Sequence, residues 1–343
     1  MSQVLTAKSP DRNGSDIVFE ADQISVGYAT GRGMIQAVRD VSLQVRRGQM
    51  VGLAGESGSG KSTLVLAATR ILKPPAIEVT GSVRLAGHDM FALSERELRR
   101  IRWNTFSFVT QSAMNALNPV MRLFEQMFDA MRAHDRRVNR AQARRRAEEV
   151  FRMVELPAVK LDSFPHQLSG GMRQRAVIAM ALLLQPELII MDEPTTALDV
   201  VAQREIIMLI RGLQQKLGFA VLLITHDLSL LLEIADEVVV LYGGRIMERG
   251  ASKDLLVDAR HPYSKALMNS FPPLHGPVEH REGIPGSPPD MLNPPAGCPF
   301  APRCPEAVDA CVSDAPPLRQ WTARDIACHV AVQAPYVVEM KDK

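Results

Sequence analysis

Residues 55–63 carry the residue types that bind phosphate, because they read GESGSGKST and match the pattern G-x-x-x-x-G-K-S/T. The glycines let backbone N–H groups approach phosphate oxygens, and a helix that follows adds the positive end of its dipole. In this pattern Lys61 reaches the β- and γ-phosphates of a nucleotide, and the hydroxyl of Ser62 ligates Mg²⁺. The flanking strand and helix disfavour the alternative, a flexible loop without a ligand. The predicted nucleotide-binding residues here are Gly55, Glu56, Ser57, Gly58, Ser59, Gly60, Lys61, Ser62 and Thr63.

Two carboxylates follow the apolar run LIIM at residues 188–191. Such a run predicts a buried strand, and the C-terminal ends of strands are where α/β sheets bind ligands. Asp192 suits the coordination shell of Mg²⁺, and Glu193 suits the general base that polarises a water attacking a γ-phosphate. The alternative is a surface acid pair that caps the next helix, which the phosphate loop disfavours.

Residues 168–172 read LSGGM and have two interpretations that stay open from these residues alone. One is a helix N-cap at Ser169 followed by a glycine turn. The other is a phosphate clamp, because the serine hydroxyl and the N–H groups of Gly170 and Gly171 at a helix start suit a γ-phosphate.

Strands that alternate with helices surround these motifs and predict a mainly parallel sheet covered by helices on both faces. One helix is predicted directly after the phosphate loop. Another is predicted before a C-cap at Gly218, from the helical spacing of the apolar residues Ile206, Ile210, Leu213 and Leu217. Alternating or wholly apolar segments predict strands over 38–45, 50–54, 188–191, 220–224 and 238–242.

The segments outside this sheet differ in composition. Residues 111–185 are rich in arginine and have a helical sequence pattern, so we predict a helical insertion between two strands. Its basic run over 136–152 is interspersed with glutamates, which favours a solvated helix face over a nucleic-acid patch. After residue 260 the chain is rich in proline, glycine and cysteine, which predicts sparse regular structure. We therefore predict a polar lead over 1–16, a main domain over 17–260 and a C-terminal tail over 261–343.

Composition bounds the class of protein. The 343 residues are 46% hydrophobic and 23% charged, with a formal net charge of +2, as in an ordinary globular protein. So small a charge argues weakly against a nucleic-acid binder. The longest apolar runs, such as 176–184, are shorter than the ~20 residues of a spanning helix, and the polar lead lacks the apolar core of a secretory signal. A role at a membrane is therefore expected to depend on partner subunits.

The three motifs, in this order and spacing, resemble those of the ABC ATPase family. The resemblance implies an α/β fold of the P-loop NTPase (RecA-like) type, with a parallel-sheet core, an antiparallel β part and a helical subdomain. It also implies that the protein binds ATP and Mg²⁺ and is an ATPase. A lone tyrosine or histidine is usually a packing residue, so the further assignments depend on the complete set of motifs.

The resemblance extends to residues outside the three motifs. Tyr28 matches the aromatic that stacks on adenine, and Gln111 matches the glutamine that touches Mg²⁺ and links the core to the helical subdomain. Asp199, in the loop over 197–199, matches the segment that crosses a dimer interface, and His226 matches the switch histidine at the γ-phosphate. The implied catalytic residues are Lys61, Glu193 and His226; the implied Mg²⁺ ligands are Ser62, Gln111 and Asp192; and Ser169, Gly170 and Gly171 join the ATP site.

In this family two ATPase domains pair head to tail, and each ATP lies between one subunit's phosphate loop and the other's Ser-Gly-Gly. One copy of each motif here therefore implies a dimer with a second ABC ATPase subunit, either a paralogue or this chain itself. ATP binding closes the dimer and hydrolysis opens it, which moves membrane subunits through the region around Gln111. Met172 stands where the family often has glutamine, but it is common in the peptide-importer branch, so activity is expected to survive.

The tail resembles the C-terminal region of oligopeptide/dipeptide importer ATPases, through residues 261–263 (HPY), 284–286 (IPG) and 297–304 (GCPFAPRC). The resemblance as a whole covers about residues 17–330. It implies an ATP-hydrolysing subunit that powers an importer of this class, peripheral to the cytoplasmic face of the inner membrane. The implied partners are two transmembrane permease subunits and, indirectly, an extracytoplasmic substrate-binding protein, with no nucleic acid.

The 4 cysteines all lie in the tail, with the spacing C-x5-C-x6-C-x16-C. In the cytoplasm disulfides are disfavoured, and a proline-rich tail with little core is a candidate for a metal staple. Tight C-x2-4-C zinc pairs are absent, so a 4Fe–4S cluster is favoured and Zn²⁺ is the alternative, with free thiols or disulfides still open. The resemblance to peptide importers also favours 4Fe–4S. The predicted ligands are Cys298, Cys304, Cys311 and Cys328.

Two rival functions fit parts of the sequence. A soluble ABC-type ATPase that acts on nucleic acid or in iron–sulfur assembly would share the motifs, but DNA-repair relatives typically have duplicated modules and long insertions. A non-hydrolysing regulatory subunit is disfavoured because the implied catalytic and Mg²⁺-binding residues are all present.

Overall fold

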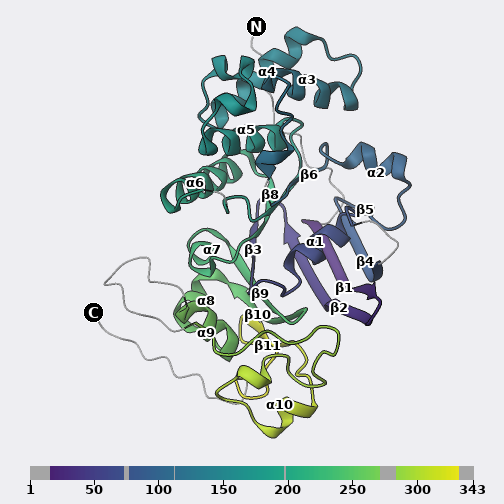
Figure 1. Ribbon diagram of the computed structural model, residues 1–343, viewed down its shortest axis with the longest axis vertical. Coiled ribbons are helices and arrows are strands. Elements are labelled where there is room, and N and C mark those ends of the chain that lie inside the picture. Colours follow the sequence, from purple (N-terminus) through teal and green to yellow (C-terminus); the bar gives the residue numbers. More distant parts are fainter. Residues whose placement is uncertain (1–15, 73–76, 112, 197, 271–282, 332–343) are drawn as a thin grey trace. The chain divides into compact units, whose positions relative to one another are not determined.

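The computed structural model describes residues 16–72, 77–111, 113–196, 198–270 and 283–331 (Figure 1). The chain folds into two compact units, each assembled from separate stretches of the sequence. Unit 1 takes its described residues from Met1–Asp22, Ser42–Val51 and Ser82–Thr225, and unit 2 takes them from Gln23–Val41, Gly52–Gly81 and His226–Lys343. Apart from Asp16, the predicted polar lead lies outside the described residues.

A parallel sheet forms the centre of unit 1, with strand β7 (Leu188–Asp192) between β6 (Phe106–Val109) and β8 (Ala220–Ile224). Every residue of β7 and β8 is buried, as expected of apolar strands covered on both faces. Strand β3 (Met50–Ala54) begins beside β8, where the N–H of Val221 donates to the carbonyl of Gln49 (2.9 Å). The strands predicted over 50–54, 188–191 and 220–224 are therefore confirmed.

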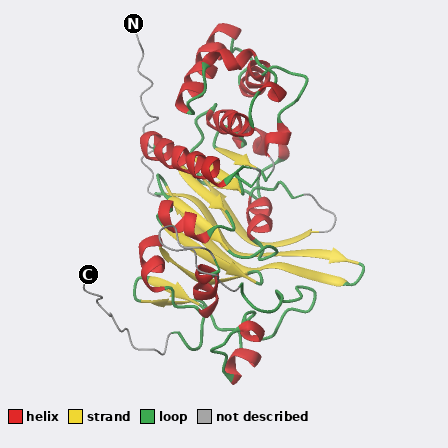
Figure 2. Ribbon diagram, turned by 60° about the vertical axis from the view of Figure 1, so that its left-hand side comes forward, coloured by secondary structure: helices red, strands yellow, loops and turns green. Residues whose placement is uncertain are grey.

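The helices between β6 and β7 are α3 (Leu123–His134), α4 (Arg140–Met153) and α5 (Gly170–Leu182), which pack as one cluster (Figures 1 and 2). Helix α4 begins with a capping box formed by Asn139 and Gln142. Its arginines form ion pairs: Arg144 contacts Asp162 (2.6 Å), and Arg146 contacts Glu149 (2.8 Å). These pairs agree with the solvated helix face predicted for the basic run.

The same eight-stranded sheet continues in unit 2, where β11, β12, β10 and β9 are neighbours in that order and pair antiparallel, and the end of β3 lies next to β9. It contains β9 (Glu237–Tyr242) and β10 (Arg245–Ala251), joined by a tight turn, so the strand predicted over 238–242 is confirmed. Strands β11 (Arg319–Trp321) and β12 (Arg324–Ile326) come from the tail, and Ile326 lies opposite Glu248 of β10. In the described part of the tail, residues 261–270 and 283–331, regular structure is sparse, as predicted, but these two strands extend a sheet and were not predicted.

A separate sheet has the order β2-β1-β4-β5, in which β4 and β5 pair antiparallel, and its three long strands each run through both units. The strand predicted over 38–45 lies within β2, where Val41, Leu43 and Val45 are buried. The α/β class with an antiparallel part is therefore confirmed. The bounds are β1 (Ile17–Thr30), β2 (Gly33–Arg46), β4 (Ile77–Leu85) and β5 (His88–Asp89).

The remaining α-helices are short apart from α6 (Val200–Leu217), whose C-cap Gly218 has φ 74° as predicted. Ile206, Ile210 and Leu213 of α6 are buried, but Leu217 is 41% exposed because the helix ends there. None of the helices in the described ranges is long and apolar enough to span a bilayer. The others are α1 (Lys61–Ala68), α2 (Glu95–Ile101), α7 (Leu228–Ile234), α8 (Ser252–Asp258), α9 (Pro262–Asn269) and α10 (Asp309–Ser313), with 3-10 turns η1 (Ala113–Ala116), η2 (Ala158–Asp162), η3 (Pro165–Gln167) and η4 (Ala301–Arg303).

Candidate functional site

The phosphate loop connects buried strand β3 to helix α1, which begins at Lys61, so the predicted strand–loop–helix order is present. Two of its glycines are required by backbone geometry. Gly55 has φ +145°, and a Cβ there would lie 2.2 Å from the carbonyl oxygen of Leu241. Gly60 has φ +101°, and its Cβ would lie 2.4 Å from the carbonyl oxygen of Ala37. Any other residue would force the backbone apart at both positions.

The ammonium group of Lys61 is held inside this loop. Lys61 is buried, and its Nζ donates to the carbonyl oxygens of Gly55 and Glu56 (2.8 Å each) and to Oγ of Ser59 (3.1 Å). These bonds place one positive charge among the residues predicted to bind phosphate. Hydrogen bonds to backbone carbonyls offset the cost of burying that charge.

Tyr28 and Ser62 also lie near the loop. The hydroxyl of Tyr28 is 3.2 Å from Oγ1 of Thr63, in the first turn of α1. Ser62 is half-buried beside it. The structure therefore brings Tyr28 to the loop through its hydroxyl. Its assignment as an adenine-stacking residue stays a prediction.

Asp192 and Glu193 lie at the C-terminal end of β7 in unit 1. Asp192 is buried, at 5% exposure, and the N–H of Glu193 donates to the carbonyl of Ile224 (2.9 Å). Glu193 has φ 46°, a strained value for a residue with a side chain, and its Oε2 accepts from Oγ1 of Thr196 (2.8 Å). The next helix is capped by Asp199 instead, so the alternative of a helix-capping acid pair is wrong.

The register of the parallel strands places a further predicted residue at the same edge. Val109 lies opposite Met191, so Gln111, two residues after Val109, and the carboxylates after Met191 leave the sheet at one edge. Gln111 is exposed there. This is the edge where α/β sheets bind ligands.

Ser169 is the N-cap of α5, and its Oγ accepts from the N–H of Met172 (3.3 Å). The predicted N-cap at Ser169 is therefore confirmed. Ser169 is exposed at this helix start. A Cβ added at Gly171 would meet no described atom within 4 Å, so the packing of this chain does not require glycine there. Both interpretations of the Ser-Gly-Gly segment are compatible with this arrangement.

Asp199 and His226 lie at helix starts as well. Asp199 caps α6 by accepting from the N–H of Ala202 (2.9 Å), while Ala197 of the same predicted loop lies outside the described residues. His226 is exposed after β8, in unit 2, next to Asp227, which caps α7. Their assigned functions stay predictions.

The sequence did not single out two tail residues that contact the phosphate loop. The hydroxyl of Tyr263 accepts from the N–H of Glu56 (2.8 Å), and the guanidinium of Arg303 pairs with the Glu56 carboxylate (2.7 Å). Both belong to segments that carried the resemblance of the tail. That resemblance was the only signal in the sequence that could have identified them.

The four tail cysteines are free thiols, so the disulfide alternative is wrong in this structure. Cys298, Cys311 and Cys328 are buried, and burial raises the pKa of Cys298 to about 11 and that of Cys304 and Cys328 above the usual range. Within the part of the chain that the structure describes, no group of three or more His, Cys, Asp or Glu side chains is arranged to hold a metal ion. The structure therefore gives no support to the predicted 4Fe–4S or Zn²⁺ site.

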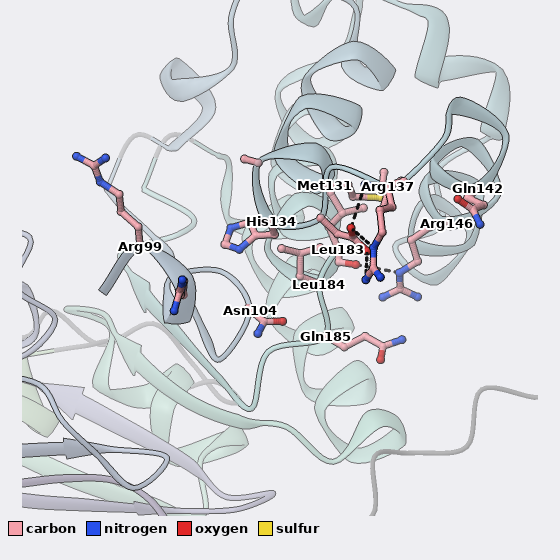
Figure 3. Close-up of a pocket in the computed structure, with 14 residues that line it drawn as sticks. Arg99, Asn104, Met131, His134, Arg137, Gln142, Arg146, Leu183, Leu184 and Gln185 are labelled. Carbon is pink, nitrogen blue, oxygen red and sulfur yellow. Dashed lines mark hydrogen bonds and ion pairs between the residues drawn. The ribbon is translucent and has the colours of Figure 1, made fainter. Parts of the chain in front are cut away.

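A separate cavity of about 1010 Å³ lies in unit 1 (Figure 3). It is lined by side chains from α2, α3 and α4, from the loop between α3 and α4 and from the residues just after α5, including Arg99, Arg137 and Arg146. Arg137 pairs with Asp135, and Arg146 donates to the carbonyls of residues 182 and 183. None of the predicted site residues lines this cavity.

Comparisons with known proteins identify the family. A family model described as ABC transporter matches residues 38–196, and one described as Oligopeptide/dipeptide transporter, C-terminal region, matches residues 247–311. The chain is 39% identical over 316 residues to the dipeptide transport ATP-binding protein DppD of Caldanaerobacter subterraneus subsp. tengcongensis, covering 92% of this chain and 96% of that protein. It is 39% identical over 337 residues to the oligopeptide transport ATP-binding protein OppD of Escherichia coli strain K12, covering 97% and 99%.

Solved structures agree with this assignment. The dimeric ATP-binding cassette MJ0796, in a post-hydrolysis state with ADP and Pi, superposes with a TM-score of 0.61 at 30% identity, over 68% of this chain and 98% of that one. The protein cbiO1 of Clostridium perfringens, part of the ABC transporter complex cbiONQ, superposes with a TM-score of 0.61 at 25% identity, over 71% and 92%. The chain therefore belongs to the ATP-binding proteins of the ABC transporter family, in the branch of the oligopeptide and dipeptide transporters.

Proposed function

We propose that this chain hydrolyses ATP to power an importer of oligopeptides or dipeptides. The observation that carries the proposal is the match along almost the whole chain to proteins named as peptide transport ATP-binding proteins, tail included. The buried ammonium of Lys61 at the centre of an intact phosphate loop supports the ATPase part.

In this proposal each of the predicted site residues has a stated task. Lys61 exchanges its bonds to loop carbonyls for bonds to the β- and γ-phosphates of ATP, while Tyr28 stacks on adenine. Glu193 accepts the proton of the attacking water, and His226 contacts the γ-phosphate. Mg²⁺, when bound, neutralises charge on the phosphates, and its proposed ligands are Ser62, Gln111 and Asp192.

The proposed partners follow from the motif set. Ser169, Gly170, Gly171 and Asp199 meet the nucleotide bound by a second ATPase subunit, so the working form is a dimer. Two permease subunits carry the substrate through the membrane, fed by an extracytoplasmic binding protein. The chain acts at the cytoplasmic face of the inner membrane, with residues 17–260 as the ATPase domain and 261–343 as the tail.

The 4Fe–4S cluster in the tail stays a sequence prediction without structural support. An iron assay and a visible absorption spectrum of anaerobically purified protein test it directly. Stoichiometric iron with a broad visible band would support the cluster. Colourless, iron-free protein that retains nucleotide binding would exclude it as a resident cofactor.

Replacement of the proposed general base tests the function. In the complex reconstituted with its permease subunits in vesicles, Glu193→Gln is expected to bind ATP, to hydrolyse it about 10³-fold more slowly and to abolish uptake of labelled peptide. The matched control is Glu187→Gln. Glu187 lies just before the N-terminal end of β7, and its carboxylate pairs with Arg47 (2.6 Å).

Two results would contradict the proposal. Wild-type turnover in Glu193→Gln would remove Glu193 from the mechanism. ATP hydrolysis that responds to duplex DNA and not to the permease subunits would favour the soluble rival.

A further inference from the structure

Each polar group of Glu56, the second residue of the phosphate loop, is bonded. Its N–H donates to the hydroxyl of Tyr263 (2.8 Å), and its carbonyl accepts from Nζ of Lys61 (2.8 Å). Its carboxylate accepts two bonds from Arg303, from Nη1 to Oε2 (2.7 Å) and from Nη2 to Oε1 (3.1 Å). Two tail residues therefore fix the same loop residue whose carbonyl holds the predicted catalytic lysine.

Arg303 uses every N–H of its guanidinium group. Besides the fork onto Glu56, Nη1 donates to the hydroxyl of Tyr242 (2.9 Å), Nη2 to the carbonyl of Ile284 (3.0 Å) and Nε to the carbonyl of Pro285 (2.7 Å). Its side chain is 5% exposed, so any donor that lost its acceptor would lie unpaired away from water. Lysine has no planar fork and could not make these bonds together.

The tail that carries these residues is packed firmly against the end of β9. The rings of Tyr242, Tyr263 and Phe300 form one buried cluster, with centroids 4.4 to 5.4 Å apart. Gly243, just after β9, has φ +53°, and a Cβ there would lie 2.8 Å from Cβ of Pro299. The tail therefore packs closely against the end of β9, where the carbonyl of Leu241 also lies close to Gly55 of the loop.

A second ion pair anchors the tail without touching the loop. Arg249 of β10 donates from Nε to Oδ2 of Asp325 in β12 (2.6 Å), with side chains 32% and 21% exposed. This pair holds the tail to the sheet, as Arg303 does. It therefore separates general anchoring of the tail from a specific effect on the phosphate loop.

We propose that Arg303 and Tyr263 are positioning residues for the phosphate loop. Through Glu56 they fix the carbonyl that binds the ammonium of Lys61, and so the C-terminal region sets the affinity of the loop for nucleotide phosphates. The inference rests on the proposed nucleotide site. It adds that two tail residues help to position the phosphate loop of that site.

Nucleotide affinity of the full-length chain tests this inference, with Mg²⁺ and the fluorescent analogue mant-ATP as the probe. Arg303→Met is expected to weaken mant-ATP binding about tenfold. Arg303→Lys is expected to weaken it less, because lysine retains the positive charge. Tyr263→Phe retains the aromatic cluster but removes the acceptor for the Glu56 N–H, and it is expected to weaken binding about fivefold. Thermal unfolding identifies variants that have not folded.

A double-mutant cycle and a control complete the test. Glu56→Gln combined with Arg303→Met is expected to weaken binding no more than Arg303→Met alone, because both changes break one interaction. Asp325→Asn is expected to lower thermal stability and leave mant-ATP binding unchanged. Wild-type affinity in folded Arg303→Met and Tyr263→Phe, or strictly additive losses, would overturn the inference. Failure of the wild-type chain to bind mant-ATP would instead overturn the proposed nucleotide site.

Discussion

Two segments of this chain are predicted to meet phosphate, and they are built in opposite ways. The phosphate loop of unit 2 is enclosed: Lys61 is buried, and Gly55 and Gly60 press against backbone carbonyls. The Ser-Gly-Gly segment of unit 1 is open: Ser169 is exposed, and a Cβ at Gly171 would touch nothing that the structure describes within 4 Å.

The contrast indicates where each segment obtains its geometry. The loop is preorganised by its own chain, through the strand before it, the turn after β9 and the tail residue Arg303. The Ser-Gly-Gly segment forms the start of α5 and leaves Ser169 exposed, and we propose that this helix start meets a ligand brought by another chain. We propose that the same residue types serve stability in one segment and recognition in the other.

A pair of glycine substitutions tests this contrast and has the largest expected effect on stability. Gly55→Ala is expected to cost about 3 kcal/mol or more of unfolding free energy, because a Cβ there meets the carbonyl of Leu241 at 2.2 Å. Gly171→Ala is expected to leave stability unchanged or to raise it by up to about 1 kcal/mol, because alanine favours the helix. Chemical denaturation measures both.

The activity of the same pair sharpens the comparison. In the assembled transporter Gly171→Ala is expected to lower ATP turnover at least tenfold, although the isolated chain binds mant-ATP normally. Undiminished turnover in that variant would mean that Gly171 meets no phosphate. Full stability of Gly55→Ala would mean that the loop is less constrained than its geometry indicates.

A pair of serine N-caps gives a smaller effect. Ser169 caps α5, and Ser94 caps α2 with a capping box. Alanine at either position is expected to cost about 1 kcal/mol of stability, because each loses its bond to a backbone N–H. Only Ser169→Ala is expected to lower turnover in the assembled transporter. Equal effects of the two variants on turnover would reduce Ser169 to a structural cap.

Local pattern predicted the elements that position the site. Strands β3 and β8 agree with the sequence prediction to the residue, because each is a wholly buried apolar run that is followed directly by a glycine or a polar residue. The helix cap at Gly218 was also predictable, because its positive φ favours glycine. Short-range chemistry is enough for such features.

Contacts between distant segments could not be predicted in this way. Arg303 and Glu56 are separated by 247 positions, and neither residue carries a local signal for the other. Strands β11 and β12 have 3 residues each, too few for a hydrophobic period. The cysteine spacing suggested a metal, but spacing cannot show whether the folded tail arranges the described side chains as a metal-binding group.

The central claim is that this chain meets phosphate twice, once through its own loop and once through Ser169 facing the nucleotide of a second subunit. Vanadate trapped with Mg-ADP occupies the γ-phosphate position, and ultraviolet light then cleaves the backbone beside it. In the assembled transporter we expect two cuts in this chain, one within residues 55–63 and one at Ser169. A cut in the phosphate loop alone would contradict the account.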